Sequence, residues 1–268
     1  MDVFGGAGSV KNRRGPRGPR GPRGLPGSIN DICQWLPKTV LSNLQKYDEN
    51  GSFFINDPTK DLARSGQEVK KWISRSVRGL NLVAEKPSSD LVKLSDRYAL
   101  GFEKNRYVSK DLSVLTTLRG CSGFICVTFK MAGEGEQVLI SNYEEDSDND
   151  YCEIRVTATE IILHIHSDDE IIQHSCKDWT TLYVECNTDD TTTYFKYDVN
   201  GRSGSYTRPS TEIFISESIA LGSRYDDTHF LNGQVAALEI YESDQPSETP
   251  EALKKIVIEN QRVEWVTY

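Results

Sequence analysis

The sequence lacks a long hydrophobic run. No stretch approaches the roughly 18–20 consecutive apolar residues needed to span a bilayer, so we expect no membrane span. The first nine residues, Met-Asp-Val-Phe-Gly-Gly-Ala-Gly-Ser, also have no apolar segment of the kind that forms a secretory signal. Hydrophobic residues make up 37% of the chain, which is enough for a core.

Catalytic motifs are missing as well. The chain holds no phosphate-binding loop, no nucleotide fingerprint and no Ser-His-Asp grouping. Glycosidases need two carboxylates across a cleft. The strand-like segment around Glu153 offers a single acid, and the densest acids lie in predicted loops. We therefore expect a protein that is not an enzyme.

The six cysteines form no C-x-x-C pair and match no zinc-site spacing. Cys152 and Cys186 occupy apolar positions of strand-like segments, which favours buried thiols. An even number of cysteines also permits disulfides in an oxidising compartment. No cofactor is expected, with calcium as the one candidate ion.

Charge is divided unevenly along the chain. Residues 1–27 hold six basic side chains and one acidic one, about +5, and the remainder carries about −14 to give the net −9. Such an arm can neutralise phosphates, so residues 11–23 could bind nucleic acid without sequence preference. The arginines of this basic arm are Arg13, Arg14, Arg17, Arg20 and Arg23.

Glycine recurs at every third position within this arm, at Gly15, Gly18, Gly21, Gly24 and Gly27. This is the collagen pattern, because only glycine fits the crowded axis of a triple helix and proline favours its extended backbone. The repeat predicts a homotrimer. It is short, however, so a neighbouring segment must help to hold three chains together. Nucleic-acid binding does not require strict glycine spacing and is the alternative interpretation.

Composition divides the chain into five segments: an N-terminal anchor or tail (1–14), the collagen-like repeat (15–27), a helical neck or linker (28–95), a β-rich domain (96–260) and a C-terminal tail (261–268). Within the neck, Val69, Trp72, Ile73 and Val77 lie on one predicted helical face. This face predicts either a trimerisation neck or a helix that packs on the domain of its own chain.

From about residue 96 the hydrophobic period changes to two. Ile125, Val127 and Phe129 alternate with a second set of side chains, and later segments repeat the pattern. Asn200-Gly201 predicts a tight hairpin, because both residues tolerate a positive φ. Many short strands separated by polar turns predict a mainly β fold, an antiparallel jelly-roll sandwich.

A closing helix is predicted after the strands. Thr249-Pro250-Glu251 has the composition of a helix start. Leu253, Ile256 and Val257 are expected on its inner face.

Two segments of the β-rich part have a recognisable pattern. One runs from Ile-Ala-Leu-Gly222 through Phe230 and Gly233 to Tyr241, and the other begins at Trp179 and ends in the Asn-Gly hairpin. Together they resemble the laminin-G/pentraxin-like (concanavalin A-like) jelly roll. In this interpretation Phe230 enters the core and Gly233 lets the chain turn tightly. The resemblance covers residues 96–260.

The resemblance implies binding rather than catalysis, with a glycan or protein receptor recognised on a sheet or loop rim. Together with the collagen-like repeat, it is similar to stalk-and-head proteins of extracellular matrix or viral fibres. We therefore expect an extracellular or virion-associated homotrimer. The alternatives are a matrix protein with a truncated gene model and a particle protein that holds nucleic acid with its basic arm.

Dense carboxylates suggest a calcium site, because calcium takes six to eight oxygen ligands from flexible loops. The most acidic run of the β-rich domain is residues 144–150, and a second acidic pair precedes Phe230. A solvated loop is the simpler interpretation of both. The candidate ligands are Asp146, Asp148, Asp150, Asp226 and Asp227.

Histidines offer a second metal hypothesis. His164 and His166 lie two apart on one strand face, a spacing that can ligate a transition metal. With a turn at residues 167–170, His174 would pair opposite Leu163 and point to the other face. We therefore expect exposed strand histidines instead of a metal site.

Overall fold

The protein is built from two antiparallel β-sheets and one helix among the residues that the structure describes. The structure is a computed structural model describing residues 35–40, 53–55, 67–72, 82–86, 89–94, 97–109, 122–142, 152–165, 168–188, 192–208, 219–224, 226–243, 249 and 251–265. Its elements are β1 (Trp35–Val40), β2 (Phe53–Ile55), β3 (Gln67–Trp72), β4 (Leu82–Lys86), β5 (Ser89–Leu94), β6 (Arg97–Glu103), β7 (Arg106–Ser109), β8 (Ser122–Met131), β9 (Gln137–Asn142), β10 (Cys152–Val156), β11 (Glu160–Ile165), β12 (Asp168–Gln173), β13 (Thr180–Thr188), β14 (Thr193–Val199), β15 (Arg202–Arg208), β16 (Ile219–Leu221), β17 (Asn232–Ser243) and α2 (Glu251–Trp265). The predicted mainly β, antiparallel sandwich with a C-terminal helix is confirmed.

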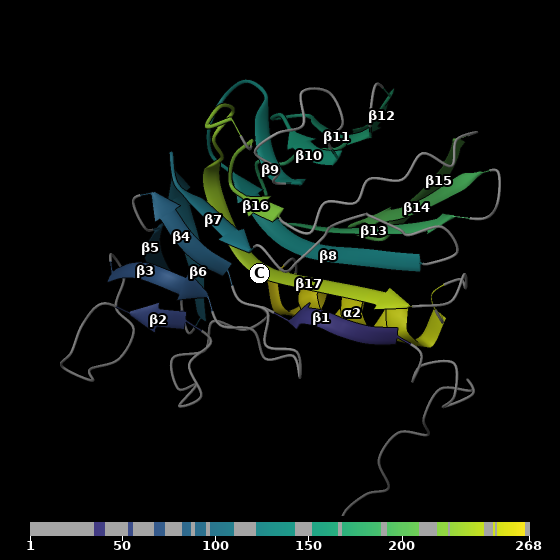
Figure 1. Cartoon of the computed structure of the whole chain (residues 1–268), viewed down its shortest axis with the longest axis horizontal. Coiled ribbons are helices and arrows are strands. Elements are labelled where there is room, and N and C mark those ends of the chain that lie inside the picture. Colours follow the sequence, from purple (N-terminus) through teal and green to yellow (C-terminus); the bar gives the residue numbers. More distant parts are fainter. Residues whose placement is uncertain are drawn as a thin grey trace, which may run out of the picture.

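The strands form two layers, which we call sheet I and sheet II (Figure 1). Sheet I has the order β12-β11-β10-β9-β16-β7-β4. Sheet II has the order β15-β14-β13-β8-β17, and the far edge of β17 pairs with β6 at one end and β1 at the other. β5 extends sheet II beyond β6, and β3 pairs with both β4 and β5, which joins the two sheets.

The core lies between the sheets and follows from period-two alternation. Ile125, Val127 and Phe129 of β8 point into it and are almost fully buried. Simple alternation of inward and outward side chains fails in β17, because its core residues Val235 and Leu238 are three positions apart. A register shift between Val235 and Ala237 restores it, as a β-bulge does.

Helix α2 covers part of the outer face of sheet II and runs along β17 in Figure 1. Leu253, Val257 and Ile258 bury their side chains against the aromatic residues of that face. The prediction for Ile256 is wrong: its side chain is 46% exposed and Ile258 takes the inner position. The helix also continues to Trp265, so the predicted tail boundary at residue 261 falls inside it.

The predicted helical neck is wrong where the structure describes it. Residues 67–72 form strand β3, which pairs with β2, β4 and β5, and the other described segments of 28–95 are also strands. β1 pairs with β17, and its irregularity between Pro37 and Thr39 fits proline on an edge strand. Pairing of β3 with the strands before and after it therefore overrode a short helical pattern. The described segments of 28–95 belong to the sandwich instead of a separate neck.

Two residues quoted for the family resemblance have other roles than predicted. Phe230 is only half-buried, and the next residue, Leu231, is the one in the core. Gly233 lies inside β17, where a Cβ atom would be 2.3 Å from the carbonyl oxygen of Lys130. Gly233 therefore permits close packing of strands and makes no turn. Tyr241 packs on the outer-face cluster under α2, and Gly222 has the positive φ that glycine tolerates.

Several predictions lie outside the described residues. They include the collagen-like glycines, the basic arm and residues 144–150. Among the described helices, none has the length and apolar character to cross a membrane. The predicted hairpin at Asn200-Gly201 is confirmed, with φ of 49° and 88° between β14 and β15.

Candidate functional site

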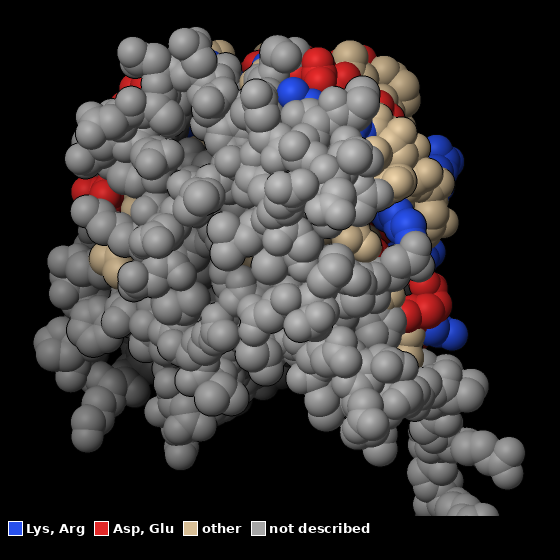
Figure 2. Space-filling view, turned by 45° about the vertical axis from the view of Figure 1, so that its right-hand side comes forward, with Lys and Arg blue, Asp and Glu red and all other residues tan. Residues whose placement is uncertain are grey.

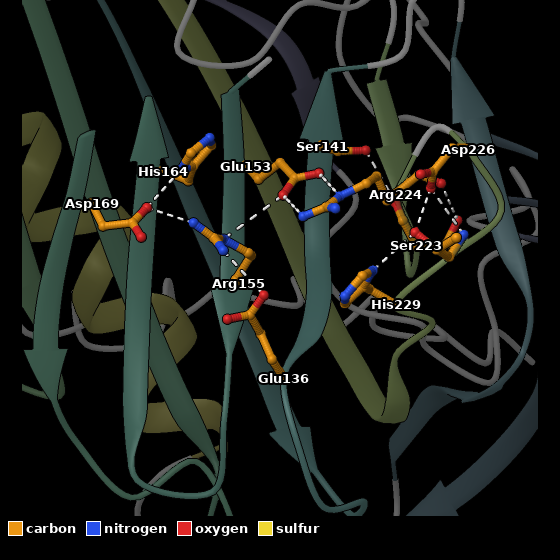
Figure 3. Close-up of polar contacts among 11 residues, drawn as sticks. Glu136, Ser141, Glu153, Arg155, His164, Asp169, Ser223, Arg224, Asp226 and His229 are labelled. Atoms are coloured by element: carbon orange, nitrogen blue, oxygen red, sulfur yellow. Dashed lines mark hydrogen bonds and ion pairs between the residues drawn. The ribbon is translucent and has the colours of Figure 1, made fainter. Parts of the chain in front are cut away.

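The outer face of sheet I holds a network of charged side chains (Figure 3). At its centre is Glu153 on β10, which is fully buried on that face. The guanidinium of Arg224 donates two hydrogen bonds to its carboxylate, of 2.7 and 2.9 Å. Two parallel bonds of this kind are the strongest geometry for an arginine–carboxylate pair. The pair ties the loop after β16 to the middle of sheet I.

A second arginine closes the network. Arg155 donates to Glu136 and to Asp169, and its Nε lies 3.8 Å from the Glu153 carboxylate. Asp169 also contacts Nδ1 of His164 at 2.6 Å. The charged groups thus bind one another across β10, β11 and β12 (Figure 3), which leaves little charge to attract a ligand.

The acidic pair predicted for calcium is engaged by its own chain. Asp226 accepts hydrogen bonds from the backbone and hydroxyl of Thr228. Asp227 pairs with Arg106 at 2.7 Å. Within the described ranges, no three metal-type side chains come together. Calcium binding by Asp146, Asp148 and Asp150 remains a prediction, because these residues lie outside the described part of the chain.

His164 and His174 do not converge, and the register predicted for them is wrong. β12 begins at Asp168, so Leu163 pairs with Glu170, and His174 follows the strand. His174 contacts the hydroxyl of Thr180 in the connection to β13. Burial and the nearby Arg202 lower the pKa of His174 from its usual value of 6.5. His166 is outside the described residues.

The described cysteines are buried thiols of low reactivity. Cys126, Cys152, Cys176 and Cys186 are free thiols that lie inside the protein, as predicted for Cys152 and Cys186. Burial raises the pKa of Cys176 to about 12 and shifts that of Cys152 further up. Such thiols are poor nucleophiles at neutral pH.

The outer face of sheet II contains a groove of about 420 Å³ beside the part covered by α2. It lies where β5, β6, β17 and β8 run side by side. Its lining combines small, amide, charged and larger apolar residues: Val92, Gly101, Phe102, Glu103, Asn105, Lys130, Ala132, Asn232, Gly233 and Gln234.

Small side chains hollow out this groove. Gln234 of β17 lies opposite Gly101 of β6 on one side and opposite Lys130 of β8 on the other. The Gln234 amide therefore lies between a lysine and a position without a side chain. One position further along, Gly233 lies between β6 and β8. Gly101 has no side chain on this outer row and leaves space there, whereas Gly233 lets the backbones of β17 and β8 pack closely. The polar groups line the sides of the space.

Trp179 lies beside the groove on the same face. Its ring packs against Ala99 of β6 and Ala236 of β17, and it stays half-buried. Ala99 is two residues from Gly101, and Ala236 is two residues from Gln234, a step of about 7 Å along a strand. An aromatic surface and a row of polar groups therefore adjoin on sheet II.

The polar walls are fixed by the neighbouring backbone. The Asn105 side chain accepts a hydrogen bond from the backbone N–H of Glu103. The backbone N–H of Asn232 donates to the Gln137 side chain at 2.8 Å, and Gln137 itself is buried. These contacts hold the groove in shape without using the amide of Gln234.

Basic and acidic side chains lie next to one another where the view of Figure 2 shows described residues, along its right-hand edge. The two faces differ in how their polar groups are used.

No protein-family model matches the sequence, and no curated protein matches it. Among solved structures, GH54 α-L-arabinofuranosidase soaked with a cyclic sulfate inhibitor is similar, with a TM-score of 0.55 and 12% identity over 84% of this chain and 61% of that chain. Arabinofuranosidase complexed with arabinofuranosyl-α-1,2-xylobiose gives a TM-score of 0.52 and 13% identity over 72% and 51%. The chain thus spans between half and two thirds of these structures. At such identities the likeness shows a β-sandwich fold alone.

The groove was not predicted from the sequence. Its residues come from β5, β6, β8, β17 and the segments that adjoin them, and β17 is far along the chain from the other three. Most of these residues are small or common polar types. The sequence pattern marks Trp179 and Gly233, and both for the fold alone. The one local hint was Gly233 inside an otherwise apolar strand, which often marks close approach of a backbone or ligand.

Proposed function

We propose that this protein is a non-enzymatic glycan-binding protein whose site is the groove on sheet II with Trp179 at its side. The observation that supports this most is the combination of a hollow lined by amides and a lysine with an adjoining indole. Sugars present hydroxyl groups on their edges and C–H groups on their faces. Amides and ammonium groups bind the former, and a flat aromatic ring packs on the latter.

A glycan fits this groove better than a protein segment does. Protein interfaces bury a core of large apolar side chains. The lining here is dominated by glycine, alanine and polar groups, with Phe102 and Val92 as its large apolar members. The site is also of the size at which small-ligand pockets begin.

An oligosaccharide array probed with the full chain and with Trp179→Ala tests the proposal. We expect the full chain to bind a subset of printed oligosaccharides and Trp179→Ala to bind them about tenfold less tightly, since an indole face that removes about 60 Å² of apolar surface from water contributes about 1.5 kcal/mol. Bound oligosaccharides should be recovered intact by mass spectrometry. Equal binding by the variant, or cleavage of the sugar, would contradict the proposal.

Presentation by a trimer is the second part of the proposal. The Gly15–Gly27 repeat would form a short collagen-like stalk that displays three sandwich domains, outside a cell or on a virus particle. Linked sites raise effective concentration, so weak single sites gain avidity. Sedimentation equilibrium of the full chain against Gly21→Ala tests this. A trimer weakened by the substitution is expected. A monomeric full chain would leave the arm as a nucleic-acid-binding segment.

A further inference from the structure

The sheet face that forms the groove continues beneath helix α2. Thr128 lies two residues from Lys130 on β8, so it points to the same side of sheet II. Its hydroxyl donates to the side chain of Gln261 on α2 and contacts the hydroxyl of Thr181. The last turns of α2 therefore stand at the end of the groove.

Each end of α2 is held by a buried glutamate of sheet II. Glu185 accepts a 2.7 Å bond from the backbone N–H of Thr249, just before the helix, and a bond from Tyr183. Glu239 accepts bonds from Gln261 near the other end and from Tyr241. The side chain of Gln261 also donates to the carbonyl oxygen of Cys126. Each carboxylate thus accepts hydrogen bonds both from the sheet and from the helix segment.

This face is unusual for the support of a permanently docked helix. A structural helix commonly packs on apolar side chains. Here two carboxylates are buried, at 3% and 7% exposure for Glu185 and Glu239. Buried carboxylates cost free energy unless they are fully hydrogen-bonded. Apolar contact from the helix comes from Leu253, Val257 and Ile258.

The same face has the side chains of a sugar-binding surface. The rings of Phe124 and Tyr241 stack at 4.6 Å with an angle of 12°, and Tyr183 adjoins Phe124 at 5.1 Å. The glutamates and threonines surround this aromatic surface. Carboxylates accept hydrogen bonds from hydroxyl groups, which sugars supply in number.

We propose that α2 is a displaceable cover over an extension of the groove, and that the covered face binds the further residues of a longer oligosaccharide. This rests on the proposed function of the groove. A ligand that leaves the groove toward β13 would replace Gln261 and Thr249 as partners of the two glutamates. Segments with few apolar contacts open at lower free energy than the whole fold.

The buried thiols report on opening without any ligand. Cys126 lies beneath α2, whereas Cys152 and Cys186 lie in the main core. We expect N-ethylmaleimide to label Cys126 faster than the two core thiols, with mass spectrometry of peptides as the readout. Gln261→Ala should speed labelling of Cys126 by about tenfold, the effect of about one net hydrogen bond. Asn260→Ala, an exposed neighbour on the same helix, is the matched control and should change nothing.

Binding completes the test, using an array of oligosaccharide series of increasing length. Gln261→Ala should bind the longer oligosaccharides about tenfold more tightly than the unsubstituted chain does, because one hydrogen bond that holds α2 on the sheet is lost. Both chains should bind the shortest oligosaccharides equally. If Cys126 is labelled no faster than Cys152, α2 opens only when the whole protein unfolds, and the proposal that α2 is displaceable is wrong. If Cys126 is labelled faster but Gln261→Ala gains no affinity for longer oligosaccharides, the proposal that the face beneath α2 binds sugar is wrong. Failure of every chain to bind any sugar would instead reject the function proposed for the groove.

Discussion

The outer faces of the two sheets use their polar residues in opposite ways. On sheet I, Arg155 and Arg224 bind acidic side chains of their own chain, so the charges stabilise the fold. On sheet II, glycine and alanine leave a hollow whose amide and ammonium groups stand beside an indole. The charged side chains of sheet I therefore bind one another, and the groove on sheet II is the face that we propose for a ligand.

The largest expected effect comes from breaking the buried pair on sheet I. Arg224→Met leaves the Glu153 carboxylate buried beside only the more distant Arg155. Breaking a buried ion pair by removing one partner costs about 3–5 kcal/mol. Urea unfolding should show this loss, while the molecules that remain folded keep their affinity for oligosaccharides. A loss below about 1 kcal/mol, the value of an exposed pair, would contradict the structural role.

Gly233→Ala should damage the groove face. The new Cβ atom would meet the Lys130 carbonyl oxygen at 2.3 Å, and this is backbone that cannot rotate away. We expect a loss of about 3 kcal/mol by urea unfolding together with weaker oligosaccharide binding, because Lys130 must shift.

Gly123→Ala is the matched control on the same strand pair. Its Cβ atom would lie 3.3 Å from the Tyr241 carbonyl oxygen, a contact that a small backbone adjustment relieves. This variant should lose about 1 kcal/mol or less and retain binding. Equal losses for the two variants would show that close packing at Gly233 has no special role.

The smallest effect concerns the connection between the sheets. His174 follows β12 of sheet I and precedes β13 of sheet II, and its folded pKa is below 6.5. As the pH falls below about 6.5, the unfolded chain takes up a proton first, so the folded state loses stability until the folded pKa is passed. His174→Gln should flatten the stability profile below that pH, measured as the urea midpoint. An unchanged slope would contradict this origin of the acid sensitivity.

The strands of residues 122–243 could be predicted because alternation reports burial on one side of a sheet. β8 shows this alternation clearly. Asn200-Gly201 predicts the hairpin between β14 and β15 from backbone preference alone. The strand β3 could not be predicted, because the spacing of Val69 and Trp72 also suits a helix and its partners lie in other segments. Likewise, Ile256 and Ile258 are equally apolar, and only the docking geometry of α2 decides which of them is buried.

The candidate site was harder to predict for a physical reason. A groove is made by what is missing from neighbouring strands, and Gly101 comes to lie beside Gln234 only through the pairing of β6 with β17. The acidic residues Asp226 and Asp227 attracted attention as ligands because charge is visible in a sequence. In the structure, Asp226 accepts hydrogen bonds from Thr228 and Asp227 pairs with Arg106.

Calorimetric titration tests the contrast between the faces most directly. The oligosaccharide bound most strongly on the array would be titrated into the full chain, Gln234→Ala on sheet II and Arg155→Ala on sheet I. We predict about tenfold weaker binding for Gln234→Ala, from the loss of one or two hydrogen bonds, and unchanged affinity for Arg155→Ala. Weaker binding for Arg155→Ala with an unaffected Gln234→Ala would place the ligand on sheet I and contradict the assignment.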